Sequence, residues 1–324
     1  MHELPELDRR RFLERAGGCV AWMLLAGASP GAAARVFARE RGRVIQQEPW
    51  GRLERIADGV WALVSTPLVE HPDARRTLCN GGIIAGRAGV LVVEGFGSDE
   101  GAAWMSQQAE QLTGRQATHV LVTHYHGDHC NGLHGFGTGA NAPKTMATER
   151  TRALIAERSR VPEERRALPD AVIPVSGPDL LDLGGRTVRL LAADGHTPSD
   201  VALHLDDPPV VFCGDLVWNG MFPNYVDADP PRLAASVSAL GANEGTVYVP
   251  GHGTLADAAA MRRYADLLDH IGDAARRAIA AGRPIEEAAA QYKLPAGVAD
   301  WTLFNAQYFR TAFYAWQRAL ARPS

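Results

Sequence analysis

One short segment, T-H-Y-H-G-D-H, concentrates the groups of this chain that are best suited to bind a metal. His124, His126, Asp128 and His129 stand within six residues and follow an apolar run. A strand that ends in such a loop can direct alternate imidazoles toward one point, while Asp128 and His129 reach a second point beside it. Neutral imidazole and carboxylate suit zinc and its neighbours. The segment therefore predicts a metal site that holds one ion or two.

Three further loops each carry one histidine or aspartate after an apolar stretch. Glycines stand beside these residues and permit close approach of the backbone. Each loop alone is a weak signal, but together they indicate one metal-binding edge. The loops are Gly195-His196-Thr197-Pro198, Gly214-Asp215 and Pro250-Gly251-His252-Gly253.

The elements that must position these loops follow from hydrophobic periodicity and turn residues. We expect a polar linker at 40–49 and a largely helical chain from residue 257, broken at 282–284. Two strand-rich halves bordered by helices predict an αββα sandwich of the α/β (α+β) class. The expected strands are 52–57 and 60–64 around Asp58-Gly59, then 82–85, 90–93, 117–123, 143–147, 181–183, 187–192, 201–205, 210–213 and 246–249, with helices at 98–112, 149–158 and 230–240.

The four loops together resemble those of the metallo-β-lactamase-fold hydrolases, from about residue 53 to residue 252. The resemblance implies a four-layer αββα sandwich with a binuclear zinc site at one edge and a helical C-terminal extension. It implies that Asp215 bridges the two ions. Glu94 departs from the aspartate that many members have, which leaves its supporting role open. The other implied ligands are His124, His126 and His196 for the first ion, and Asp128, His129 and His252 for the second.

The same resemblance implies the chemistry. Two zinc ions per chain would share a hydroxide, because zinc lowers the pKa of bound water from about 15.7 toward 7. Asp128 would be the catalytic residue that orients the hydroxide and moves its proton. We therefore expect a zinc-dependent hydrolase that cleaves a small ester, thioester, lactone or lactam bond. Iron and manganese stay open as alternative metals.

Asp215 narrows the subclass, because most true β-lactamases of this fold carry cysteine or serine at that position. The ligand set looks more like that of glyoxalase II and the lactonases. Three alternatives stay open: a mononuclear iron dioxygenase on the same fold, a β-lactamase, and an accessory protein that binds a cofactor without turnover. The substrate and the residues that bind it are unknown at this point.

The N-terminal segment resembles a twin-arginine export signal. Arg9-Arg10 is followed by Phe12-Leu13, a weakly apolar stretch and small residues that suit cleavage. We expect residues 1–39 to be signal and linker, 40–256 the sandwich domain, and 257–324 the helical extension. The expected partner of the precursor is the twin-arginine export machinery, and the expected location is the bacterial periplasm or the exterior.

Composition limits the remaining functions. The net charge of −4 over 324 residues offers no general field for nucleic acid, so we expect a small-molecule substrate. Beyond the first forty residues no apolar run is long enough to span a bilayer. We interpret Cys79, Cys130 and Cys213 as buried thiols rather than a disulfide.

Aromatic and histidine residues outside the four loops leave two questions open. Trp218, Phe222 and Tyr225 could line the pocket or fill the core, with equal weight. Aromatic residues between 301 and 316 recur at helical spacing, which favours packing or a homodimer through the C-terminal helices. Four histidines outside the ligand loops are interpreted as structural or surface residues: His71, His119, His134 and His204.

Overall fold

Two packed β-sheets carry the predicted ligand loops at one edge. The computed structural model describes residues 42–66, 72–73, 75–174 and 179–322. The first sheet has eight strands in sequential order, antiparallel from β1 to β5 and parallel from β5 to β8. Its strands are β1 (Arg43–Glu48), β2 (Gly51–Ala57), β3 (Val60–Ser65), β4 (Gly81–Ala85), β5 (Val90–Val93), β6 (His119–Leu121), β7 (Lys144–Thr148) and β8 (Ala171–Ile173).

The second sheet has the strand order β13-β12-β11-β10-β9. Only β12 and β13 pair in parallel, and the other neighbours are antiparallel. Strands β9 and β10 form a hairpin around Gly184-Gly185. The strands are β9 (Asp179–Asp182), β10 (Thr187–Ala193), β11 (Asp200–Leu205), β12 (Val210–Asn219) and β13 (Val247–Gly253).

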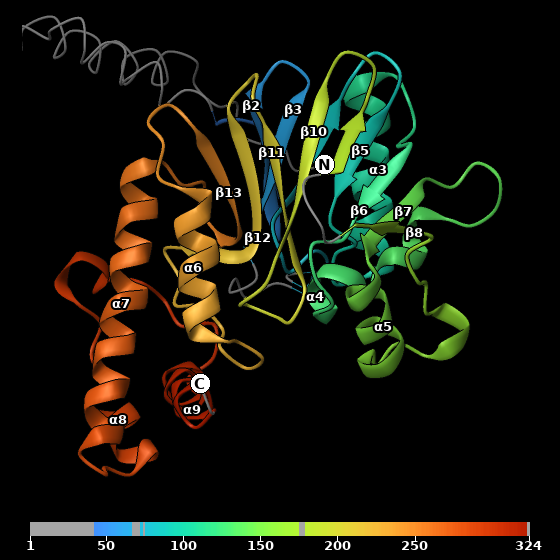
Figure 1. The fold of residues 1–324 in the computed structure, drawn as a ribbon. Helices are drawn as coiled ribbons and strands as arrows, with labels where there is room; N and C mark the ends of the chain where they lie inside the picture. The colour runs from blue at the N-terminus through green and yellow to red at the C-terminus, as the bar shows by residue number, and fades with distance from the viewer. Residues whose placement is uncertain (1–41, 67–71, 74, 175–178, 323–324) are drawn as a thin grey trace, which may run out of the picture. The chain divides into compact units, whose positions relative to one another are not determined.

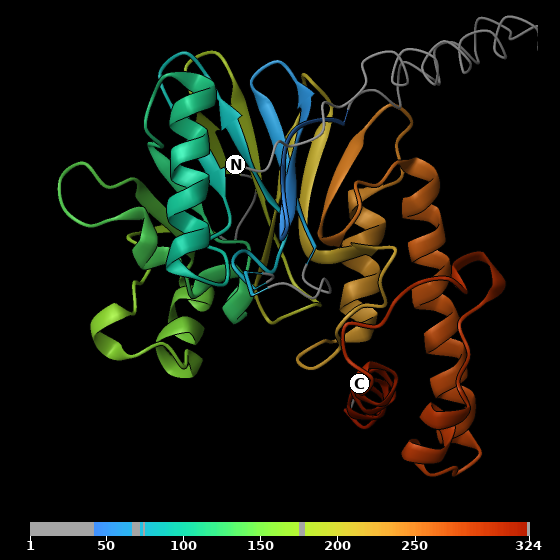
Figure 2. The same ribbon diagram turned by 180° about the vertical axis from the view of Figure 1, so that it is seen from behind.

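Helices cover the outer face of each sheet, which gives the predicted four layers (Figures 1 and 2). Helix α3 (Asp99–Thr113) and helix α5 (Glu149–Arg158) share a core with the first sheet. Helix α6 (Pro230–Leu240) and helix α7 (Ala258–Ala280) share a core with the second. A third core of branched aliphatic side chains lies between the sheets. The αββα sandwich is therefore confirmed.

The C-terminal segment is less helical than expected. Helix α8 (Ile285–Gln291), the 3₁₀ turn η3 (Ala296–Val298) and helix α9 (Tyr308–Leu320) follow α7, but most of 292–307 is not helical. There Thr302 forms an isolated bridge to Met221, at the end of the second sheet. Thr302 therefore pairs with the chain that follows β12 instead of continuing a helix.

Three further boundaries differ from the prediction. The expected polar linker at 40–49 contains β1, a mostly exposed edge strand that pairs with β2. The polar side chains of β1 gave no strand pattern in the sequence, because an edge strand buries few apolar side chains. The expected strand at 117–123 shortens to β6. Strands β12 and β13 run on through Asp215 and His252 to Asn219 and Gly253, because the ladder resumes after register shifts around Gly214.

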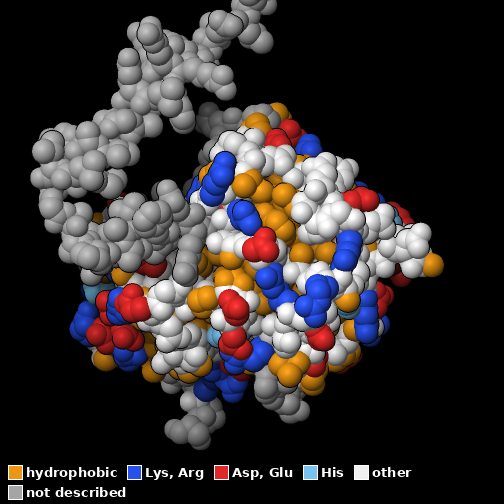
Figure 3. All heavy atoms as spheres, turned by 90° about the horizontal axis from the view of Figure 1, so that it is seen from above, with side chains coloured by type: hydrophobic (Ala, Val, Ile, Leu, Met, Phe, Trp, Pro, Cys, Tyr) orange, Lys and Arg blue, Asp and Glu red, His pale blue; other side chains and the backbone are white. Residues whose placement is uncertain are grey.

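The edge opposite the predicted site is rich in arginine. A cavity of about 690 Å³ there is lined by turns of both sheets. Arg186 donates to the carbonyls of Ala85 and Asp58, at 3.0 and 2.9 Å, and so links the two sheets. Figure 3 looks onto this face and shows Lys and Arg side chains among apolar ones. The guanidinium of Arg186 is therefore committed to holding turns together.

The cysteine prediction is confirmed, because Cys79, Cys130 and Cys213 are all buried and free. Burial raises the pKa of the Cys79 thiol to about 12 and raises the pKa values of the Cys130 and Cys213 thiols further. In the part of the chain that the structure describes, no helix is long and apolar enough to cross a bilayer. The predicted export signal and His71 lie outside the described residues.

Candidate metal centre

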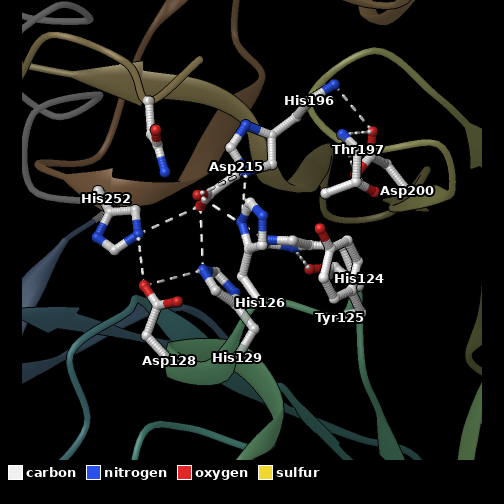
Figure 4. Close-up of polar contacts among 12 residues, drawn as sticks. His124, Tyr125, His126, Asp128, His129, His196, Thr197, Asp200, Asp215 and His252 are labelled. Atoms are coloured by element: carbon white, nitrogen blue, oxygen red, sulfur yellow. Dashed lines mark hydrogen bonds and ion pairs between the residues drawn. The ribbon is translucent and has the colours of Figure 1, made fainter. Parts of the chain in front are cut away.

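The segment after β6 directs its four candidate ligands to two adjacent points. It ends the strand and turns at once into the short helix α4 (Gly127–Cys130), in which His129 N donates to His126 O at 2.9 Å. Asp128 and His129 therefore lie on a helical turn, while His124 precedes it in a bend and His126 is its extended N-cap residue. Figure 4 shows His124 and His126 on one side of this turn and Asp128 on the other.

His196, Asp215 and His252 approach the same place from the second sheet. His196 stands in the loop between β10 and β11, and the other two lie within β12 and β13. Gly251 makes the approach of β13 feasible, since a Cβ on it would lie 1.9 Å from Asp215 Oδ1. The structure thus brings all seven predicted residues together. His119, His134 and His204 lie outside the donor groups that the described residues form.

The seven side chains form two groups of potential ligand atoms. The first contains four residues and the second three, and within each group the ligand atoms lie within 4.8 Å of one another. In the first group His196 Nε2 and His126 Nδ1 are 3.0 Å apart. The groups are His124, His126, His196 and Asp215, and Asp128, His129 and His252.

Asp215 presents one carboxylate oxygen to each group. Its Oδ2 lies 3.2 Å from His196 Nε2 and 3.9 Å from His124 Nε2. Its Oδ1 lies 3.1 Å from His129 Nε2 and 3.4 Å from His252 Nε2. This is the arrangement that a bridging carboxylate requires.

Several of these buried atoms form no hydrogen bond. They include Asp215 Oδ1 and the Nε2 atoms of His124, His129 and His252. Buried polar atoms without partners are uncommon in proteins and call for an explanation. Five imidazoles and two carboxylates in two clusters are a donor set that zinc accepts. The residues therefore fit metal ions at this position.

The charges of the cluster shift its pKa values in opposite directions. Burial opposes ionisation of Asp215, but the charges of His252, His129 and His196 outweigh it and hold the pKa of Asp215 well below its usual range. Burial also opposes the charged form of Asp128, and His129 and His252 lower the pKa of that carboxyl. Conversely, burial disfavours protonated His252, but Asp215 and Asp128 raise its pKa to about 9. Burial and the charge of His129 lower the pKa of His124.

Asp227 supports His126 and was not predicted from the sequence. His126 Nε2 lies 3.0 Å from Asp227 Oδ2, while its Nδ1 faces His196. Tyr125 donates its hydroxyl hydrogen to the same carboxylate, and Arg158 donates to the Tyr125 hydroxyl at 2.8 Å. No local spacing in the sequence links residue 227 to residue 126, so only the fold could reveal this contact.

Glu94 lies beneath the cluster, in the position that the sequence left open. Its carboxylate accepts from Thr123 Oγ1 at 2.6 Å and lies 3.1 Å from His129 Nδ1. Glu94 adopts a φ of +85°, which is rare for a residue with a side chain and is typical of functional sites. Glu94 thus reaches His129, one of the predicted ligands, from this backbone position.

Asp200 orders the loop that carries His196. It accepts from His196 N at 3.1 Å, from Thr197 N at 3.0 Å and from Thr197 Oγ1 at 2.7 Å. Burial raises the pKa of Asp200 to about 7, although the bonds from Thr197 oppose the rise. The loop conformation therefore depends on a carboxyl that the sequence analysis did not single out.

A cavity of about 490 Å³ opens above the two groups. Of the three aromatic residues after Asp215, Trp218 lines the cavity and its ring stacks on His252 at 4.0 Å. Phe222 and Tyr225 are buried in the core beside the second sheet. Two aromatic residues of the C-terminal segment, Phe304 and Tyr308, also line the cavity.

The sequence matches the family model for the metallo-beta-lactamase superfamily over residues 74–252. The chain belongs to this superfamily. The matched region contains all seven residues of the two donor groups. It ends before α7, so the C-terminal helices lie beyond the part that the family model covers.

Curated relatives of this superfamily member include hydroxyacylglutathione hydrolases. The one from Acidiphilium cryptum (strain JF-5) is 29% identical over 192 residues, which is 58% of this chain and 72% of the relative. The one from Rhodobacter capsulatus is 27% identical over 127 residues, which is 39% of this chain and 44% of the relative. The chain spans about half the length of the first curated relatives that it matches.

Solved structures show the same fold at low identity. The metallo-beta-lactamase from Pontibacter korlensis aligns with a TM-score of 0.57 and 20% identity, and covers 68% of this chain and 99% of that one. The stereoselective inverting sec-alkylsulfatase Pisa1 from Pseudomonas sp. aligns with a TM-score of 0.66 and 16% identity. The alignment covers 84% of this chain and 50% of that one. At these identities the likeness concerns the fold alone.

Proposed function

We propose that the protein is a zinc-dependent hydrolase that cleaves a small ester, thioester, lactone or lactam. The observation that carries the proposal is the position of Asp215, with one oxygen toward each of two histidine groups. One ion would be held by His124, His126 and His196, the other by Asp128, His129 and His252, with Asp215 between them. This assignment is supported by the buried nitrogen and oxygen atoms of both groups that form no hydrogen bond.

When bound, the two cations would polarise the scissile carbonyl and make a water nucleophile available near neutral pH. Asp128 is the more exposed of the two carboxylates of this centre, since its side chain is 28% exposed and that of Asp215 is 3% exposed. The lowered pKa of Asp128 keeps it ionised. It can therefore accept a proton from the attacking water and return it to the leaving group.

Two observations support an ester or thioester over a lactam. Curated relatives of the chain are named hydroxyacylglutathione hydrolases. An aspartate, rather than a cysteine or serine, stands between the two groups. The mononuclear iron alternative would leave the second group, Asp128, His129 and His252, without a function.

Metal analysis and a substrate panel test the proposal together. The metal content of the full-length protein as isolated is measured by inductively coupled plasma mass spectrometry, and zinc-loaded protein is assayed on an ester, a thioester, a lactone and a β-lactam. We expect two zinc ions per chain and hydrolysis that His126→Ala abolishes and His134→Ala retains. One tightly bound iron without hydrolysis would instead indicate the dioxygenase. Hydrolysis that His126→Ala leaves unchanged would overturn the proposed site.

We also propose that the chain is exported by the twin-arginine route, on the basis of Arg9-Arg10 and the residues that follow. Substituting both arginines with lysine in the full chain should leave the precursor in the cytoplasm, as seen by cell fractionation. Export that survives this change would contradict the proposal. The domain boundaries at residues 39 and 256 and a homodimer through the C-terminal helices remain predictions. Light scattering of the purified protein tests the dimer.

A further inference from the structure

The cavity above the donor groups has two walls of different chemistry. One wall comes from the C-terminal segment and the loop after β12, and the other follows the end of α5. Figures 1 and 2 show α5, which ends at Arg158, and α9, which begins at Tyr308, on opposite sides of α4. The difference between the two walls constrains the class of substrate.

The first wall is apolar and partly open to solvent. Phe304 and Val226 line the cavity and are 39% and 51% exposed, although large apolar side chains are usually covered. The Phe304 ring centroid is 6.4 Å from that of His252. An exposed apolar surface next to a reactive centre is typical of a binding site.

The backbone fixes this wall in place. Phe222 N donates to Thr302 O at 2.9 Å, and Thr302 N donates to Gly220 O at 3.1 Å. These bonds attach the 301–304 segment to the end of β12, two residues before Phe304. Arg318 of α9 donates to the carbonyl of Val226 at 3.3 Å. The apolar wall is therefore held by the C-terminal segment, outside the part that the family model matches.

The second wall is cationic. Arg158, Arg160 and Arg75 line the cavity. Arg158 is oriented by its bond to the Tyr125 hydroxyl and lies 3.5 Å from Asp227 Oδ1. Arg160 forms no ion pair with any carboxylate of the residues that the structure describes.

The carboxylates of the cavity leave Arg160 without an acidic partner. Asp128 and Asp215 belong to the donor groups, and Asp227 is bonded to His126 and Tyr125 and pairs with Arg158. The guanidinium of Arg160 therefore has no acidic partner in the cavity. Planar guanidinium groups bind carboxylate and other oxyanions strongly.

We propose that this protein acts on an anionic amphiphile: an ester, thioester or lactone with an apolar arm and an anionic group. The apolar arm packs on Phe304 and Val226, and the anionic group binds Arg160 with help from Arg158. The inference rests on the proposed hydrolase function, because it places the scissile bond between the two walls. The specificity residues Phe304 and Arg160 belong to none of the four ligand loops.

Binding of inert probes tests the two walls independently of turnover. Isothermal titration of the zinc-loaded full-length protein compares hexane-1-sulfonate with methanesulfonate, which lacks the arm, and hexan-1-ol, which lacks the charge. We expect the first to bind at least about tenfold more tightly than either of the others. Arg160→Ala and Phe304→Ala should each weaken its binding about tenfold, and 0.5 M salt should weaken it in the parent protein.

Two matched variants serve as controls. Arg263→Ala removes an exposed arginine of α7, and Leu303→Ala shortens the apolar neighbour of Phe304; neither residue lines the cavity. Both should bind hexane-1-sulfonate as the parent does. Equal affinity for the three probes, or equal losses in the control variants, would overturn the inference.

Activity measurements separate this inference from the proposed function. The ratio of kcat/KM for mono-4-nitrophenyl adipate to that for 4-nitrophenyl hexanoate reports preference for an anion on the same chain length. We expect a ratio above about ten that Arg160→Ala lowers about tenfold. Hydrolysis without this preference would leave the proposed function and overturn the inference. Selective probe binding without hydrolysis of any substrate in either panel would contradict the proposed function and would leave only the part of the inference that concerns binding of an anionic amphiphile.

Discussion

At the scale of single residues, the centre works by opposing charges in a buried space. Asp215 and Asp128 stay ionised because histidines surround them, and His252 and His129 hold protons more tightly because carboxylates surround them. A metal ion must displace those protons to reach the imidazole nitrogens. Metal binding, protonation and stability are therefore linked in this cluster.

The stability of the chelated protein should depend on pH in a defined direction. The pKa of His252 is about 9 in the folded chain and 6.5 ordinarily, because Asp215 and Asp128 outweigh the cost of burial. This contribution to stability is complete below pH 6.5 and is lost as pH rises through 9. We expect the Tm of EDTA-treated protein to fall across that window, measured by scanning fluorimetry.

Two variants check the origin of this slope. His252→Asn should make the fall of the Tm with pH smaller, with His129 supplying the remainder, and His134→Asn, outside the cluster, should leave the fall unchanged. The zinc-loaded protein should show little of the slope, because its histidines are already deprotonated. A Tm of the chelated protein that rises between pH 6.5 and 9 would contradict the assignment.

Asp227 should orient His126 for the metal. The Asp227 carboxylate lies against the His126 nitrogen that faces away from the metal site. Such a carboxylate fixes the tautomer and the ring orientation of a ligand histidine, and its removal typically lowers metal affinity about 10–100-fold. We expect Asp227→Ala to weaken zinc binding by about that factor in competition with a chromophoric chelator. The matched control is Asp206→Ala, which removes an exposed carboxylate paired with Arg189. Equal zinc affinity in the two variants would show that Asp227 has no such role.

At the scale of elements, the site depends on backbone segments that pack so closely at two glycines that no side chain would fit between them. Strands β12 and β13 carry Asp215 and His252 side by side in a parallel pair with shifted register. Gly214 has a φ of +52°, and a Cβ there would lie 2.8 Å from Thr123 Oγ1. The glycines beside the ligands thus set the separation of the two sheets at this edge.

Gly251→Ala should damage the centre without unfolding the chain. The new methyl would lie 1.9 Å from Asp215 Oδ1 and 2.8 Å from Asp215 N, so the carboxylate or the strand must shift. We expect the purified variant to bind less than two zinc ions per chain and to lose most hydrolytic activity. Gly297→Ala is the control, since a Cβ there meets nothing within 4 Å. Full zinc content and activity in Gly251→Ala would refute this account of the glycine.

At the scale of the whole molecule, the C-terminal helices share one core with the second sheet. Phe313 and Trp316 of α9 lie in the same cluster as Tyr264 of α7 and Val211 of β12. The same segment supplies Phe304 and Tyr308 to the cavity. Stability of the C-terminal helices and shape of the substrate cavity are therefore coupled.

Phe313→Ala should weaken the whole protein rather than α9 alone. The side chain is 2% exposed, and emptying such a site costs about 3–5 kcal/mol. We expect urea denaturation followed by circular dichroism to show one transition at a lower midpoint. Leu320→Ala, at a position 49% exposed, should change the free energy of unfolding by less than about 0.5 kcal/mol. An early, separate loss of helix in Phe313→Ala would indicate that α9 is independent.

The sequence by itself determined the strand-rich halves, the αββα class and the seven residues that converge. These signals are local: apolar runs fix strands, and histidines and glycines at their ends mark the ligand loops. The sequence did not predict edge strand β1, because that strand buries few side chains. It also did not predict that β12 continues through Asp215, because this continuation depends on a register shift against β13.

Only the tertiary structure decided what surrounds the ligands. Asp227 reaches His126 across 101 positions of the chain, and Phe304 reaches the cavity from a segment attached to Gly220. Such contacts depend on how the sheets, α5 and the C-terminal segment pack, and no periodicity along the chain encodes them. The seven residues of the donor groups could be predicted because each follows an apolar run in the sequence, whereas the residues that line the rest of the cavity are brought together by packing.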